Sequence, residues 1–157
     1  MAVYDSVVRH GTISMVTASL GINDPQVGQR CREGDEEYVF VYNAGNSQIS
    51  PAYFATVSAV SGYSVTVSMT AAIDFAVGLC KHATLTTGTY GWLMTKGFAE
   101  VKMGANASIA AGGILVPGAD GVADNKSLST GFPVPAIGKA MAAIASGASG
   151  TAFISIF

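Results

Sequence analysis

The cysteines and histidines of this sequence, the residue types that most often bind zinc, are Cys31, Cys80, His10 and His82. A zinc site takes about four such ligands in a tetrahedral arrangement, and the ligands usually come in short spacings such as CxxC. Neither cysteine belongs to a CxxC pair, so only a coincidence of folding would assemble all four. We therefore predict no metal site and two free, buried thiols. One disulfide stays open as an alternative, because the sequence does not fix the distance between the two Cβ atoms.

Nucleophilic catalysis needs a Ser or Cys beside a His that an acid orients. His82 follows Lys81 at the end of a predicted strand, and the acid nearest to it in sequence is Asp74. Along an extended strand the two would lie about 26 Å apart, at ~3.3 Å per residue. The sequence also has no GxSxG motif. His82 is interpreted as a solvated residue at a strand end, and no catalytic residue or cofactor is predicted.

The densest acidic run does not fit a glycosidase either, since that chemistry places two carboxylates on opposite sides of a cleft. The run consists of Glu33, Asp35, Glu36 and Glu37. Because these residues follow one another on one predicted loop, we interpret them as a solvated turn before a strand. A surface facing a partner's basic patch is the alternative.

Two glycine-containing loops resemble ligand sites only in part. Asp120-Gly121 followed by Asp124-Asn125 has acidic and amide oxygens but lacks a DxDxDG register and a closing Glu, so an ordinary Asp-Gly turn is favoured over a calcium loop. The stretch 104–113 is rich in glycine but lacks the GK[ST] ending of a phosphate loop.

Trp92, with Tyr90 and Met94 on the same face of a predicted strand, has two interpretations. Large aromatic side chains in a β-domain usually belong to the core, and this is our prediction for Trp92. The alternative is an exposed aromatic platform that binds carbohydrate.

The composition narrows the class of protein. Half of the 157 residues are hydrophobic and 11% are charged, well below the roughly 25% of ordinary soluble domains. Such a chain has either a core rich in Ala and Val or a surface that partners cover in an assembly. The eight Lys and Arg residues are scattered, whereas nucleic-acid binding needs them clustered, so we exclude nucleic acid as a main partner.

The sequence gives no sign of export or of membrane insertion. The first residues, MAVYDSVVRHG, lack the basic and apolar regions of a secretory signal. No apolar run approaches the ~20 residues of a membrane helix. We expect a protein that is made in a cytoplasm or held in a particle assembled there.

The pattern from Glu37 onward predicts an all-β fold, either a single β-barrel or a β-sandwich-like domain. Alternation is clearest at Tyr63–Met69, which forms a predicted hairpin with Tyr53–Val60 around Ser61-Gly62. In Phe98–Met103 the side chains of Ala99, Val101 and Met103 are expected to face the core. The other predicted strands are Ile13–Thr17, Tyr38–Tyr42, Asp74–His82, Tyr90–Lys96 (separated from Phe98 by Gly97), Ile114–Val116 and Ala152–Phe157.

Residues 1–36 read differently from the β-rich domain at 37–157. They hold several charges, four glycines and no sustained hydrophobic period, which indicates an extended or looped N-terminal arm. The alternative is an irregular layer that packs on its own domain.

A short internal sequence similarity helps to assign the secondary structure of Ala136–Ile144. The composition of this stretch favours a helix, whereas the Pro and Gly residues in and before it do not. Ala76-Val77-Gly78 is followed by Gly88-Thr89 and an apolar run, and Ala136-Ile137-Gly138 is followed by Gly150-Thr151 and an apolar run. This internal similarity predicts that Ala136–Ile144 is a strand and that the domain is a set of similar hairpins. Chance similarity is the alternative.

Glycine-punctuated strands over about three quarters of the chain resemble a known family. The segments are EYVFVYNAGNS, SGYSVTVS, AVGLCKHATLTTGTYGWLMTKGFAEVKM and GGILVPGADGVADN…AIGKAMAAIASGASGTAFISIF. They resemble the head decoration, or cement, proteins of tailed bacteriophages, small structural proteins encoded beside the major capsid gene. The resemblance implies a β-rich body on the outer surface of the virion capsid, often a homotrimer, with an N-terminal arm and no catalytic residues.

This reading makes the major capsid protein the expected partner and residues 1–36 the expected contact. The side chains favoured for contact with the lattice or a neighbouring subunit are Tyr4, Val7, Val8, Arg9 and Met15. A phage fibre or adhesion β-domain that binds carbohydrate is the alternative function. An enzyme would need an acid, a base or a metal converging in one pocket.

Overall fold

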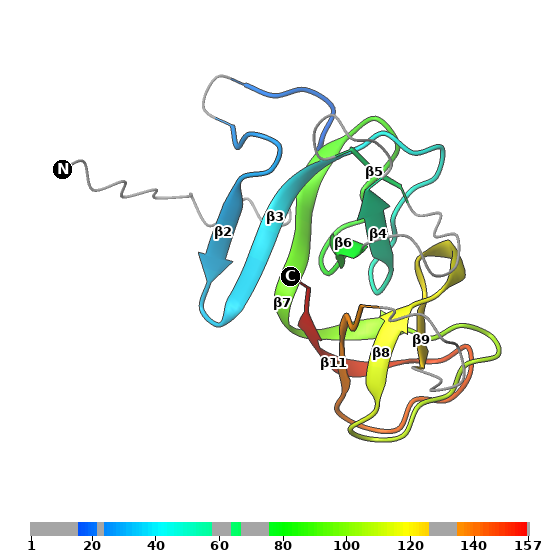
Figure 1. The fold of residues 1–157 in the computed structure, drawn as a ribbon. Helices are drawn as coiled ribbons and strands as arrows, with labels where there is room; N and C mark the ends of the chain where they lie inside the picture. The colour runs from blue at the N-terminus through cyan, green and yellow to red at the C-terminus, as the bar shows by residue number, and fades with distance from the viewer. Residues whose placement is uncertain (1–15, 22–23, 58–63, 67–75, 126–134, 157) are drawn as a thin grey trace.

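The fold is all-β, as the sequence predicts. The computed structural model describes residues 16–21, 24–57, 64–66, 76–125 and 135–156, and Figure 1 shows their arrangement. Besides one short 3-10 turn, η1 (Ala119–Gly121), the elements are β1 (Val16–Thr17), β2 (Arg30–Glu33), β3 (Glu36–Asn43), β4 (Phe54–Val57), β5 (Ser64–Thr66), β6 (Ala76–Leu79), β7 (Tyr90–Lys102), β8 (Ile114–Pro117), β9 (Ala123–Asn125), β10 (Gly138–Ala140) and β11 (Ser149–Ser155).

The longest strand, β7, is one continuous strand of 13 residues, and the prediction of two strands broken by Gly97 is wrong. Gly97 has a φ of 133°, which side chains other than glycine rarely adopt. A Cβ atom there would also lie 2.9 Å from Cγ of Glu36. The glycine therefore bends the strand without interrupting its pairing, and Figure 1 shows β7 passing from the group with β3 to the group with β11.

All eleven strands belong to one sheet, which contains two circuits of paired strands. In the first circuit β3 pairs with β5, β5 with β4, β4 with β6, β6 with β7, and β7 again with β3. In the second, β7 pairs with β11, β11 with β10, β10 with β8 and β8 with β9. A parallel bridge between Met103 and Ala123 returns that circuit to the end of β7. The whole sheet does not close, since its path ends at β2 and β9.

The two circuits are copies of one pattern, which we call the first repeat (36–95) and the second repeat (96–155). The parallel pair Asn43–Val65 corresponds to Met103–Ala123, and the antiparallel bridge Ile49–Leu85 corresponds to Ile109–Ile144. Backbone conformation repeats as well: φ is 74° at Ala52 and 79° at Gly112.

The duplicated fold confirms the internal similarity seen in the sequence, but one pair of equivalent glycines is corrected. Gly138 opens strand β10, so Ala136–Ile144 contains a strand. Gly88, however, corresponds to Gly147 and not to Gly150, because both occupy a tight turn with positive φ, 76° and 67°. Glycine is favoured there since it has no Cβ to clash.

The first circuit encloses a small core of its own, whereas the core of the second circuit is continuous with a larger cluster that includes residues of the first repeat. The first repeat buries Val39, Val41, Ile49, Ala55, Cys80, Leu85 and Leu93 as one cluster. The corresponding residues of the second repeat are also buried: Ala99, Val101, Ile109, Leu115, Ala140, Ile144 and Ala152. The predicted inward orientation of Ala99, Val101 and Met103 is thereby confirmed.

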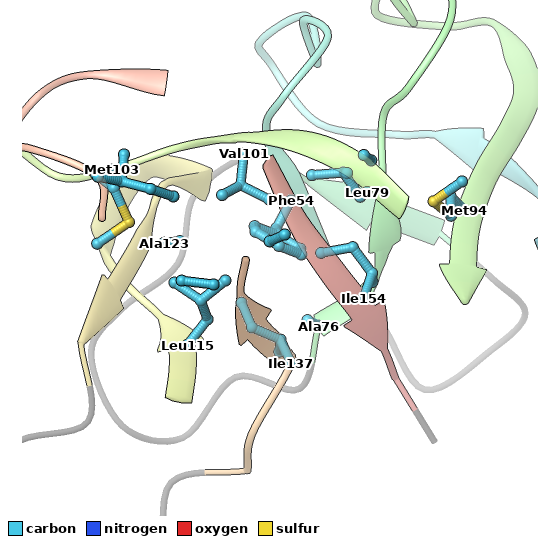
Figure 2. Close-up of a cluster of buried hydrophobic side chains, with 14 of the residues drawn as sticks. Phe54, Ala76, Leu79, Met94, Val101, Met103, Leu115, Ala123, Ile137 and Ile154 are labelled. Carbon is cyan, nitrogen blue, oxygen red and sulfur yellow. The ribbon is translucent and has the colours of Figure 1, made fainter. Parts of the chain in front are cut away.

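The two repeats are packed against each other through a shared apolar cluster. Phe54, Leu79 and Met94 of the first repeat point away from its core, since strand side chains alternate between faces. They belong to the same cluster as Val101, Leu115, Ile137 and Ile154 of the second repeat, as Figure 2 shows.

The other strand predictions are largely confirmed where the structure describes them. β4 and β5 pair antiparallel as the predicted hairpin requires, although its turn lies outside the described residues. β2 pairs with β3 from Arg30↔Val39 to Glu33↔Glu36, so part of the segment 1–36 belongs to the sheet. The boundary between an arm at 1–36 and a body at 37–157 stays a prediction. No helix among the described residues is long and apolar enough to cross a membrane.

The duplication leads to a stability prediction at Gly138. A Cβ atom at Gly138 would lie 2.5 Å from the carbonyl oxygen of Phe153, a backbone atom that cannot move alone. We expect Gly138→Ala to lower the free energy of unfolding by about 1–3 kcal/mol. Gly104→Ala is the control, because its nearest neighbour would be at 3.4 Å, an ordinary contact. Urea unfolding followed by circular dichroism measures both, and equal stability of the two variants would contradict the described register of β10 and β11.

Candidate functional site

The most connected group of polar side chains lies where β3 begins and β6 ends. Tyr38 Oη donates a hydrogen bond to Glu36 Oε2 and also lies 3.0 Å from His82 Nε2. Lys81 Nζ donates to the other oxygen of Glu36 and forms an ion pair with it. We call these four residues the polar clamp.

Sequence reasoning missed the polar clamp. Tyr38 and His82 are 44 residues apart, and only the pairing of both Tyr38 and Leu79 with Met94 brings them together. His82 is exposed, as expected for a strand end, but it is hydrogen-bonded and not merely solvated. The interpretation of the acidic run as a solvated turn is wrong for Glu36. Glu37 also has a partner, with its carboxylate 3.6 Å from Lys96 Nζ.

The donors and acceptors that each group offers determine where the protons of the polar clamp lie. A phenol has one proton, and an ionised carboxylate only accepts. Because Tyr38 gives its proton to Glu36, its oxygen must accept the bond from His82, so His82 carries a hydrogen on Nε2. Burial, followed by the hydrogen bond to Glu36 and its charge, raises the pKa of Tyr38.

The charge state of Glu36 follows from opposing effects. Burial alone would raise its pKa, but the hydrogen bonds from Lys81 and Tyr38 and the positive charges of Lys81 and His82 lower it below the usual value. At neutral pH the polar clamp therefore contains an ionised Glu36 and a neutral Tyr38. This arrangement ties β3 to the segment after β6, and the raised pKa of Tyr38 keeps its phenol protonated at neutral pH.

The two cysteines are free thiols, and the disulfide alternative is wrong; Cys80 is buried as predicted, whereas Cys31 is only partly buried. Burial raises the pKa of Cys80 to about 11, and Cys80 Sγ lies 3.1 Å from the carbonyl oxygen of Ala83, to which it donates. Burial and the nearby charge of Glu33 raise the pKa of Cys31 to about 11 as well. Both thiols are protonated at neutral pH, whereas nucleophilic attack requires the thiolate.

No three or more His, Cys, Asp or Glu side chains gather into a metal-binding group within the described ranges. Asp120 lies in η1 with a φ of 56°, and Asp124 accepts a hydrogen bond from the backbone N–H of Asn125.

Trp92 is part of the buried core, which confirms the prediction for it. Its ring centroid lies 5.0 Å from that of Phe40, and Tyr90 and Tyr42 pack beside them with centroids 4.6 Å apart. The exposed aromatic platform at Trp92 that a carbohydrate-binding domain would need is not formed.

The predicted partner-binding residues are not placed by the structure. Tyr4, Val7, Val8, Arg9 and Met15 all lie outside the described residues. Their role in binding stays a prediction.

Comparison with known proteins gives a fold and no family. No protein-family model matches the chain, and no curated protein matches it. Among solved structures, the N base of the head fibre protein gp8.5 of bacteriophage phi29 is similar with a TM-score of 0.52 at 18% sequence identity. The likeness covers 75% of this chain and 94% of that chain. The chain therefore shares most of its fold with a protein of a phage head.

The polar clamp leads to a prediction for Glu36→Gln. Because the folded-state pKa of Glu36 is lowered, its contribution to stability is complete above the usual glutamate pKa, 4.5, and is lost as the pH falls through the folded-state value. We expect the variant to lose about 1 kcal/mol at pH 7, the scale of charge-assisted hydrogen bonds that are partly exposed to water. The difference from the wild type should shrink toward zero as the pH falls below that folded-state value.

Chemical unfolding at several pH values measures this effect. Asp35→Asn is the matched control, since Asp35 stands beside Glu36 with a fully exposed side chain and a long 3.9 Å ion pair to Arg32. A loss for Glu36→Gln that does not vary with pH would contradict the described charge state.

Proposed function

We propose that this protein is a non-enzymatic structural component of a tailed-phage virion that binds the outer surface of the assembled capsid and reinforces its lattice, as decoration proteins do. The observation that carries the proposal is the fold shared with nearly the whole N base of the phi29 head fibre protein. The low content of charged residues agrees with a surface that is largely covered in an assembly.

A decoration protein stabilises a particle by binding the assembled lattice more tightly than the free subunits. Residues 1–36, with Tyr4, Val7, Val8, Arg9 and Met15, are the proposed contact with the major capsid protein. Binding through such a segment has an entropic cost of ordering, which many contacts over the lattice offset. Several copies are expected to act together on the lattice, and a trimer assembled there fits three-fold positions of a capsid.

The base of a head fibre is the second candidate, favoured by the name of the similar phi29 protein. A fibre base would also sit on the outer surface of the head, but it would carry a further distal part. Carbohydrate binding by this domain has lost its main support, because Trp92 is buried.

Co-sedimentation with capsids tests the proposal. We expect saturable binding to capsids that lack this protein and weak binding to the free capsid subunits. No binding to capsids under any salt condition would contradict the proposal. The number of copies bound per capsid at saturation separates decoration, with many, from a fibre base, with few.

The contribution of the N-terminal segment needs its own variant. Deleting residues 1–36 would also remove β2 and Glu36, which belong to the sheet and the polar clamp. Deleting residues 1–15 leaves all described residues in place. We expect this deletion to weaken capsid binding at least tenfold, and unchanged binding would show that the contact lies elsewhere.

A further inference from the structure

The outer face of the first repeat carries a row of four large side chains. Tyr38, Met94, Leu79 and Phe54 are in register across β3, β7, β6 and β4. All four are completely buried. Phe54, Leu79 and Met94 are covered by the packing of the second repeat (Figure 2), and Tyr38 is held in the polar clamp.

The second repeat has the equivalent row, but it is exposed. Phe98, Phe153, Lys139 and Ile114 are in register across β7, β11, β10 and β8. Residues paired directly across neighbouring strands point to the same side of the sheet, and the rings of Phe98 and Phe153 touch with centroids 5.1 Å apart. The side chains of Phe98 and Ile114 are 53% and 46% exposed.

Met141 extends this apolar row. It directly follows β10, its backbone N–H donates to the carbonyl oxygen of Thr151 on β11 at 3.0 Å, and its side chain is 51% exposed. Its counterpart in the first repeat is Lys81, a member of the polar clamp. We call Phe98, Ile114, Met141 and Phe153 the open row. Three of the five exposed large hydrophobic residues in the described part of the chain belong to it.

Two opposite charges lie beside the open row. Lys139 pairs with both Phe153 and Ile114, and Glu100 is two residues beyond Phe98 on the same face of β7. Both side chains are exposed, and neither forms an ion pair within the ranges that the structure describes. A surface with an apolar centre and one charge of each sign is complementary to itself when turned by a two-fold rotation.

We propose that the open row joins two copies of this chain face to face, with Lys139 of each copy opposite Glu100 of the other. Within the chain, the same row of the first repeat is buried by packing on the second repeat, against its core residues and not against the open row. This association goes beyond the proposed capsid role and does not depend on it.

Sedimentation equilibrium of the full chain without capsids tests the proposal. We expect a concentration-dependent monomer–dimer equilibrium, and Phe98→Ser should raise the dissociation constant about 30-fold or more, the effect of losing a central apolar contact. Val57→Ser is the matched control, because Val57 is 44% exposed on β4, outside the open row; it should leave the dimer unchanged.

A charge exchange tests the register of the two copies. Lys139→Glu and Glu100→Lys should each weaken the dimer, and the double variant should restore it. A monomer at all concentrations, a trimer, or an oligomer that Phe98→Ser leaves intact would overturn the proposal. If the chain is monomeric and Phe98→Ser abolishes capsid binding instead, the open row contacts the capsid and not a second copy. Because the sedimentation experiment contains no capsid, the absence of a dimer would not count against the proposed capsid role.

Discussion

The pairing of β7 with both β3 and β11 is the interaction on which the rest of the structure depends. Its first half completes the circuit of the first repeat, and its second half begins the circuit of the second. Gly97 allows this double use, since its φ of 133° bends the strand while the hydrogen-bonded pairing continues on both sides. Each circuit therefore contains part of β7, and the two repeats also share one apolar cluster.

The two repeats share a backbone and differ in their outer faces. In the first, Tyr38 is buried and Lys81 belongs to the polar clamp; in the second, their counterparts Phe98 and Met141 are exposed. A duplicated fold thus gives one face that holds the chain together and one that is available to a partner. Both thiols have raised pKa values, so neither is a thiolate at neutral pH.

The sequence predicts the local structure well and the long-range arrangement poorly. Alternation at Phe98–Met103 identified the buried side chains, and the apolar run at Tyr38 identified β3, because these signals are contained in a few residues. From sequence alone Gly97 predicts a break, since a glycine within a strand usually signals an interruption when the neighbouring strands are not known. The polar clamp and the open row depend on register between distant strands, and local pattern does not tell a buried Tyr38 from an exposed Phe98.

We propose that this domain is a structural protein of the phage head, and its fold is similar to that of the phi29 head-fibre base. Cryo-electron microscopy of the virion that contains the protein tests this claim most directly. The account predicts density on the outer surface of the shell into which both repeats fit as one body around β7. A shell with no such density, or density for the protein only inside the head, would contradict it.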